Sequence, residues 1–247
     1  MKSFEIITIF LTAGSLLSLF FYRSKGPFLY LLFLAAIAAI VQYFSDGLRW
    51  QMLAAIYILP AMFITYKYKI VNRFTGTILG AWFLISGFIP WAVPVFTMPA
   101  PEGDFSIGSE TFHWVDSSRL EWFTDENDND VREIMVQAWY PSENSDSIGT
   151  NSYMDFMNLR SKTLASAGKI PAFLPSHLDM ISTNTRNDVA CSNKLEKYPV
   201  LIFSHGITGS RHLHQILFEH LASKGYIVFA PDHSFDANLT IFPDGNI

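Results

Sequence analysis

Four long apolar runs fill the first hundred residues of this chain and constrain its fold more than any other feature. They cover Ile6–Tyr22, Pro27–Phe44, Trp50–Tyr66 and Phe74–Phe96. Each holds 17–23 residues, close to the roughly 20 that an α-helix needs to cross the hydrocarbon core of a bilayer. No charged residue lies inside any run. The sequence therefore predicts a bundle of four membrane-spanning helices.

Two other interpretations of these runs stay open. Four buried helices would require a very large globular protein around them. A cleaved signal peptide would account for the first run only, but Tyr22-Arg23-Ser24-Lys25 offers no small-residue cleavage site. Ionisable residues inside a span are the usual mark of an ion or proton pathway, and the runs contain none. We therefore interpret the bundle as an anchor rather than a transporter.

The loops between the runs differ in positive charge, which predicts the orientation of the spans. Their charges are Arg23 and Lys25 in the first loop, Asp46 and Arg49 in the second, and Lys67, Lys69 and Arg73 in the third. Lys and Arg concentrate on the cytoplasmic side of a membrane. The first and third loops are thus predicted to be cytoplasmic. The N-terminus, the second loop and everything after Phe96 are predicted to lie outside.

The charge balance changes sign near residue 100. Residues 1–100 carry seven Lys or Arg and two Asp or Glu, whereas residues 101–247 carry ten and twenty. An acidic outer domain argues against nucleic acid as a partner. The single cysteine, Cys191, cannot form an intrachain disulfide, which suits a bacterial surface or periplasm. We expect a membrane anchor over 1–97, a linker over 98–104 and a second domain over 105–247.

The second domain opens with a predicted hairpin. Thr111–Val115 is strand-like, and Arg132–Tyr140 alternates between apolar and other residues with a period of two. The acidic segment 125–130 between them predicts an antiparallel pair. Residues 142–196 form a long polar connection, with a short helix expected near Tyr153–Leu159. Connections of this length often border a functional site.

A strand–helix–strand unit follows and contains the candidate site. The apolar run Tyr198–Phe203 predicts a strand covered on both faces, and Tyr226–Ala230 predicts the next, parallel strand. Ser210 is a good N-cap for the helix between them, and Gly225 is its expected left-handed C-cap. The expected buried stripe of that helix consists of Leu213, Ile216, Leu217 and Leu221.

The turn between strand and helix, His205-Gly206-Ile207-Thr208-Gly209, matches the position of an oxyanion-hole loop. Acyl transfer passes through a tetrahedral oxyanion that backbone N–H donors stabilise. In α/β-hydrolases one donor comes from the loop after the third strand, often in an HG motif. Gly206 and the N–H of Ile207 are the candidate donor region, with His205 and Gly209 as turn support. A glycine-rich turn without chemistry is the alternative.

The other candidate catalytic or metal-binding residues near this turn have weaker support in the sequence. Ser234 lies between His233 and Asp236, but neighbours in sequence do not supply the geometry of a triad. Ser204 is interpreted as structural. The histidines are interpreted as solvated or capping residues; they are His205, His212, His214, His220 and His233. The acidic segment matches an EF-hand loop at Asp125, Asn127 and Asn129 but has Asp130 at the glycine position and Val136 at the twelfth. We predict no metal and no cofactor.

Several segments together resemble the platelet-activating factor acetylhydrolase family of the lipoprotein-associated phospholipase type. The run PVLIFSHGITGSRHLHQILFEHLASKGYIVFAPDHSFDA carries the family's FSHG turn, LAS-G helix end and DH strand end. Asp116-Ser117-Ser118-Arg119 followed by Arg132–Pro141 (REIMVQAWYP) resembles the family's opening hairpin. The resemblance covers roughly residues 103–247.

The resemblance implies an α/β-hydrolase that cleaves short or oxidised acyl esters of phospholipids without calcium. It maps Gly206 and Ile207 to one half of the oxyanion hole. The family's nucleophile lies in a downstream G-x-S-x-G elbow, which is absent from these 247 residues. We therefore expect the N-terminal half of a truncated hydrolase domain behind a membrane anchor, with nucleophile, acid and histidine beyond Ile247. Another α/β-hydrolase, such as a peptidase or dienelactone-type enzyme, and a non-catalytic membrane protein with a hydrolase-derived binding domain remain alternatives.

Overall fold

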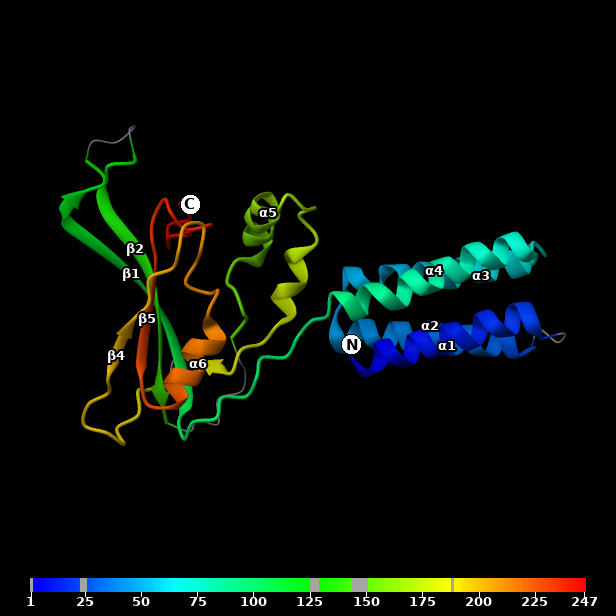
Figure 1. The fold of residues 1–247 in the computed structure, drawn as a ribbon, viewed down its shortest axis with the longest axis horizontal. Coiled ribbons are helices and arrows are strands. Elements are labelled where there is room, and N and C mark those ends of the chain that lie inside the picture. The colour runs from blue at the N-terminus through cyan, green and yellow to red at the C-terminus, as the bar shows by residue number, and fades with distance from the viewer. Residues whose placement is uncertain (1, 23–25, 125–128, 144–150, 188) are drawn as a thin grey trace. The chain divides into compact units, whose positions relative to one another are not determined.

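The computed structural model describes residues 2–22, 26–124, 129–143, 151–187 and 189–247. The chain divides into two compact units, Met1–Val95 and Phe96–Ile247. The first is helical, and the second is built on a mixed β-sheet (Figure 1).

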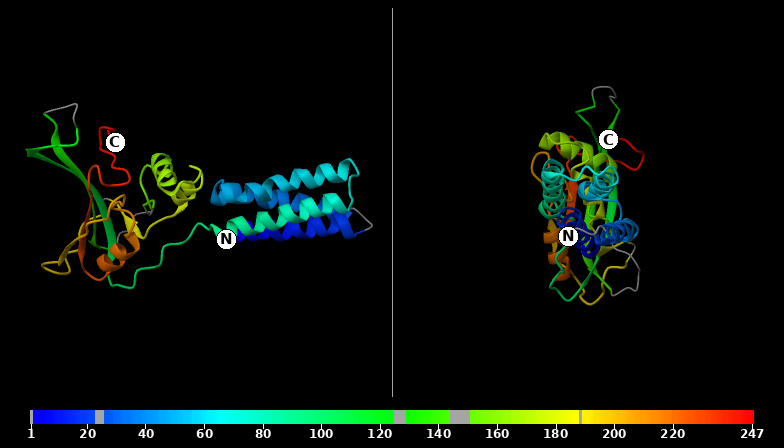
Figure 2. Two further views of the ribbon diagram at one scale, coloured as in Figure 1. Left: turned by 45° about the horizontal axis from the view of Figure 1, so that its top comes forward. Right: turned by 90° about the vertical axis from the view of Figure 1, so that its right-hand side faces the viewer.

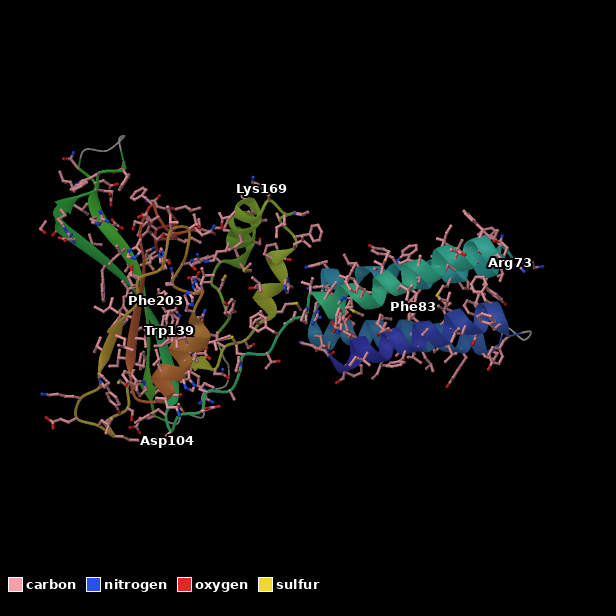
Figure 3. All side chains as sticks on the ribbon, in the orientation of Figure 1. Arg73, Phe83, Asp104, Trp139, Lys169 and Phe203 are labelled. Carbon is pink, nitrogen blue, oxygen red and sulfur yellow. The ribbon has the colours of Figure 1, made fainter. Side chains whose placement is uncertain are left out.

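The first unit consists of helices α1 (Ser3–Phe21), α2 (Gly26–Asp46), α3 (Leu53–Lys67) and α4 (Arg73–Ala92). They pack around one apolar core, and Phe83, labelled in Figure 3, packs against it. Asn72 starts α4, since its side chain accepts a hydrogen bond from the backbone N–H of Thr75 at 3.0 Å. The buried core residues are Leu19, Phe28, Leu32, Ala35, Ala39, Ile58, Leu59, Met62 and Leu79.

Three of these helices, α1, α2 and α4, are long and apolar enough to cross a membrane among the described residues. The third predicted span is divided, because a 3₁₀ turn over Trp50–Met52 precedes an α3 of 15 residues. At about 1.5 Å per residue, α3 is about 22 Å long, less than the roughly 30 Å of a hydrocarbon core. Pro60 lies inside it.

Polar side chains line the interior of the first unit. The buried residues of α1 are Glu5, Thr8, Thr12, Ser15, Ser18 and Leu19. The same helix exposes Phe10, whose exposed fraction is 72%, and Phe21. The Ser15 hydroxyl donates to the carbonyl oxygen of Phe28 on α2 at 3.3 Å. This unit therefore buries polar groups beside its apolar core and also exposes large apolar groups.

A buried ion pair lies inside the first unit, contrary to the expectation of spans without charge. Arg49 Nη2 lies 2.7 Å from Glu5 Oε1, and both side chains are fully buried. The expectation failed because α1 begins at Ser3 rather than Ile6 and so includes Glu5. The backbone N–H of Lys2 donates to Glu5 Oε2 at 2.8 Å, which holds the carboxylate at the first turn.

The second unit is built on a five-stranded sheet in the order β3-β1-β2-β5-β4. Its strands are β1 (Ser106–Leu120), β2 (Val131–Ser142), β3 (Thr185–Arg186), β4 (Val200–Ile202) and β5 (Ile227–Asp232). Strands β1 and β2 are antiparallel, as predicted, and β4 and β5 are parallel, as predicted. Because β2 also pairs antiparallel with β5, the carboxyl ends of β1, β4 and β5 lie at one edge of the sheet.

Helices α5 (Met157–Gly168) and α6 (Gln215–Ser223) lie on one side of this sheet (Figures 1 and 2). A 3₁₀ helix, Pro175–Met180, follows α5 in the long connection. Trp139 on β2 packs on Phe218 of α6 with 4.8 Å between ring centroids, and Phe203 packs on the same ring at 4.9 Å. Figure 3 labels Trp139 and Phe203 in this core.

Three details of the strand–helix–strand prediction are wrong. Helix α6 begins at Gln215 instead of following Ser210, and it buries Phe218 and Ala222 while Leu213, Ile216 and Leu217 are exposed. The backbone N–H of Arg211 is bonded to Asp232 instead of starting a helix. Strand β4 is exposed rather than covered, because it is the edge strand of the described sheet. Gly225 has the predicted left-handed conformation, with φ of 93°.

Candidate functional site

The predicted turn lies at the carboxyl edge of the sheet, where β4 and β5 both end. Parallel pairing of these strands brings residues 203–211 beside residues 232–238. In open α/β sheets, ligands bind outside the carboxyl ends of parallel strands. The turn is thus in the position where a catalytic group of this fold class would act.

Two backbone hydrogen bonds fix the far end of the turn to the segment after β5. The N–H of Thr208 donates to the carbonyl of Asp236, and the N–H of Asn238 donates to the carbonyl of Gly209, both at 2.8 Å. Thr208 has the left-handed conformation, with φ of 58°. The chain therefore changes direction at Thr208 and is held there.

The N–H groups of Gly206 and Ile207 have no acceptor within the part of the chain that the structure describes. Ile207 is 83% exposed. These two consecutive N–H groups, like the N–H of His205 before them, are available to an external anion, whereas those of Thr208 and Gly209 are bonded within the chain. This is the electrostatic requirement of an oxyanion hole.

Three side chains fix the near end of the turn. His205 Nδ1 lies 2.8 Å from the carbonyl oxygen of Gly206, and its Nε2 accepts the backbone N–H of His233 at 3.0 Å. The Ser204 hydroxyl lies 2.7 Å from His233 Nε2. Burial lowers the pKa of His233, and the neighbouring His205 lowers it further. Sequence analysis missed the Ser204–His233 contact, because the two residues are 29 positions apart.

The two glycines of the turn differ in how tightly they are packed. A Cβ at Gly209 would lie 2.7 Å from the carbonyl oxygen of Gly206 and 2.9 Å from the Cβ of His205, so only glycine fits there. A Cβ at Gly206 would meet nothing within 4 Å, and Gly206 does not have a positive φ. A side chain at position 206 would thus meet no steric obstacle.

Buried charges join the turn to the underlying sheet. The Arg211 guanidinium pairs with Asp232, which is fully buried, and with Asp155. Arg160 also binds Asp155, with Nε 2.7 Å from the carboxylate. Burial and the positive charge of Arg211 hold the pKa of His212 well below its usual range. The sequence carries no local signal for this cluster, because its members come from separate segments.

The other predicted candidates lie apart from this geometry. The Ser234 hydroxyl donates to the carbonyl of Glu133 at 2.6 Å and so points away from the turn. His214 stacks on Phe203 with 4.9 Å between ring centroids. Within the described ranges, no three His, Cys, Asp or Glu residues converge on a metal position. Asp125 and Asn127 of the acidic segment lie outside those ranges.

Comparison with known proteins identifies the second unit. The family model for platelet-activating factor acetylhydrolase, isoform II, matches residues 93–242, more than half of the chain. The chain belongs to this family. Platelet-activating factor acetylhydrolase of Cavia porcellus is 29% identical over 145 residues, and a probable 1-alkyl-2-acetylglycerophosphocholine esterase of Arthroderma benhamiae is 25% identical over 182 residues.

The alignments of this acetylhydrolase family member cover different shares of the compared chains. They include 56% and 70% of this chain but only 29% and 46% of the Cavia and Arthroderma proteins, so the chain spans less than half of either relative. Among solved structures, a ferulic acid esterase from Streptomyces cinnamoneus is 30% identical. That match covers 62% of this chain and 40% of the esterase, with a TM-score of 0.48.

Proposed function

We propose that this chain forms part of a membrane-anchored serine ester hydrolase that cleaves short or oxidised acyl esters of phospholipids. The observation that carries the proposal is the pair of unbonded N–H groups of Gly206 and Ile207 at the carboxyl edge of the sheet, in a member of an acetylhydrolase family. These groups would supply one half of the oxyanion hole. Removing a single donor of this kind costs about 10²–10³ in kcat.

The proposed serine nucleophile, acid and catalytic histidine come from sequence beyond these 247 residues. The support is that the chain spans only 29% and 46% of the relatives it matches. Ser204 is the nearest serine with a histidine partner, but its hydroxyl and the His233 ring hold the base of the turn. Neither metal, cofactor nor nucleic acid has a role in this proposal.

The apolar outer surface of the first unit supports a bilayer as the second partner. Its interior holds Glu5 and hydroxyl side chains, while Phe10 and other large apolar residues face outward. Such a surface is costly in water but suited to lipid, where polar groups must be satisfied internally. We propose a multi-pass membrane protein whose N-terminus and second unit lie outside a bacterial cell. The substrate would then be an amphiphile at the outer membrane surface.

The membrane-extracted protein at its native length tests the catalytic proposal. It should react with a fluorophosphonate probe and hydrolyse a short-chain 2-acyl phosphocholine. Ile207→Pro removes the N–H donor and should lower kcat about 10²–10³-fold, whereas Ile207→Val keeps the donor and most of the rate. Absence of labelling would favour a non-catalytic binding domain. Labelling of Ser204 in the 247-residue chain would overturn the placement of the nucleophile.

A further inference from the structure

We infer that His205 and His233 are positioning residues that hold the oxyanion turn through one fixed tautomer of His205. The inference rests on the proposed role of Gly206 and Ile207. It concerns the side chains that set where these two N–H groups lie, rather than the donors themselves.

Two hydrogen bonds determine the tautomer of His205. Its Nε2 faces the backbone N–H of His233 at 3.0 Å, and an N–H can only donate, so Nε2 carries no proton. Its Nδ1 faces the carbonyl oxygen of Gly206 at 2.8 Å, and a carbonyl can only accept, so Nδ1 carries the proton. His205 is therefore neutral and protonated on Nδ1. No other protonation state makes both bonds.

Together with the Ser204 hydroxyl, these bonds close a loop between the turn and the end of β5. Ser204 contacts the ring of His233 at 2.7 Å, and His233 in turn bonds the ring of His205, the next residue after Ser204. The two imidazole rings also pack together, with 4.5 Å between centroids. His205 is buried, which limits the access of water to its two bonds, whereas the Ser204–His233 contact is exposed.

The donors lie between two anchored points and have no bonds of their own. Upstream, His205 is tied to the end of β5 because its Nε2 accepts the N–H of His233; downstream, Thr208 is bonded to Asp236. Ile207 lies between these two fixed positions. The direction of its N–H thus depends on both anchors, and the histidine anchor is the one made by side chains.

The 247-residue chain in detergent gives a test that needs no activity. With selective ¹⁵N labelling of histidine, the ring signals that disappear in His205→Ala belong to His205. These signals should be those of the Nδ1–H tautomer. Amide hydrogen exchange should show that His205→Gln keeps the protection of the His233 N–H, since the side-chain oxygen of Gln reaches the position of Nε2. His205→Asn, which reaches only the position of Nδ1, should lose that protection. A protonated Nε2 on His205, or equal exchange in the Gln and Asn variants, would overturn the inference.

Kinetics of the native-length enzyme separate positioning from a purely structural role. His205→Asn should lower kcat at least about tenfold with KM nearly unchanged, and His205→Gln should recover most of the rate, because an oxyanion donor acts on the transition state. His233→Ala keeps the backbone N–H that His205 accepts and removes only the Ser204 contact and the ring packing, so it should lower kcat less than His205→Asn. His220→Ala removes an imidazole from α6 outside the turn and serves as the control. If the His205 tautomer and the protection of the His233 N–H are as inferred but kcat of the His205 variants does not change, His205 still holds the turn. The proposed oxyanion role of the turn then fails. If kcat falls without loss of protection, positioning is overturned.

Discussion

The two units of this chain differ in what they expose rather than in what they bury. Both bury apolar side chains, such as Phe28 and Phe218, and both bury charged ones, such as Glu5 and Asp232. In the first unit, however, large apolar side chains such as Phe10 are exposed along helices long enough to cross a membrane. In water, large apolar side chains are driven inward. In lipid that drive is absent, and polar groups instead need partners inside the protein. The exposed apolar face of the first unit is what the proposed membrane anchor requires.

Buried charge also serves the two units differently. In the first, Glu5 and Arg49 form one pair between the start of α1 and the segment after α2. In the second, Asp232 pairs with Arg211 and also accepts its backbone N–H at 2.8 Å, which ties the turn to β5. The first pair holds helices together. The second fixes the geometry of the candidate site.

The largest expected effect comes from breaking the ion pair of the first unit. Glu5→Ala leaves the Arg49 guanidinium buried without its partner and should cost about 3–5 kcal/mol of folding free energy. Titration of the lipid-reconstituted chain with sodium dodecyl sulfate would measure this loss. The double variant Glu5→Leu, Arg49→Met removes both charges and should lose much less. Equal losses in both variants would show that the pair does not govern the stability of this unit.

Placing a charge on the surface of each unit tests whether the first unit contacts lipid and the second contacts water. Phe10→Arg puts a cation on the outward face of α1 and should cost about 2.5–3.5 kcal/mol of membrane insertion if that face contacts lipid. Trp122→Arg is the matched change in the second unit, where Trp122 is 82% exposed, and should stay within about 0.5 kcal/mol. A glycosylation-reporter insertion assay would measure the effect of Phe10→Arg, and urea unfolding would measure the effect of Trp122→Arg. Similar small effects at both positions would contradict a lipid-facing first unit.

The turn glycines give a smaller effect confined to the second unit. Gly209→Ala forces a Cβ against the Gly206 carbonyl and should cost about 1–3 kcal/mol. Gly206→Ala meets no atom within 4 Å and should change stability by less than about 0.5 kcal/mol. Hydrogen exchange of the β5 amides in the full chain reports this loss and leaves α1–α4 as an internal reference. Equal sensitivity of the two glycines would contradict the geometry of the turn.

Local patterns predicted the elements of the second unit, and long-range contacts decided its details. Period-two alternation predicted the hairpin of β1 and β2, and the apolar run before His205-Gly206 predicted β4. The start of α6 was missed because Arg211 is held by Asp232, 21 positions away, and no local rule reports that bond. The Ser204–His233 contact escaped prediction for the same reason. Glu5 was missed for a different reason. Hydropathy places the start of the first apolar run at Ile6, whereas the hydrogen-bonded helix already starts at Ser3.

Acid should weaken the second unit and leave the first unchanged. Burial, with Arg211 and Arg160, lowers the pKa of His212 in the folded state, whereas an unfolded histidine titrates near 6.5. Below about pH 6.5 the unfolded chain therefore binds more protons, and stability falls with pH by at most about 1.4 kcal/mol per unit for this residue until its folded pKa is reached. Hydrogen exchange at pH 7.5 and 5.5, corrected for intrinsic rates, should show lost protection in β5 but not in α1–α4, since residues 1–95 contain no histidine. His212→Asn should remove the share of the difference that His212 causes, while the lowered pKa of His233 leaves a smaller remainder. Equal loss in both units would mean that a general effect of acid, rather than this buried imidazole, is responsible.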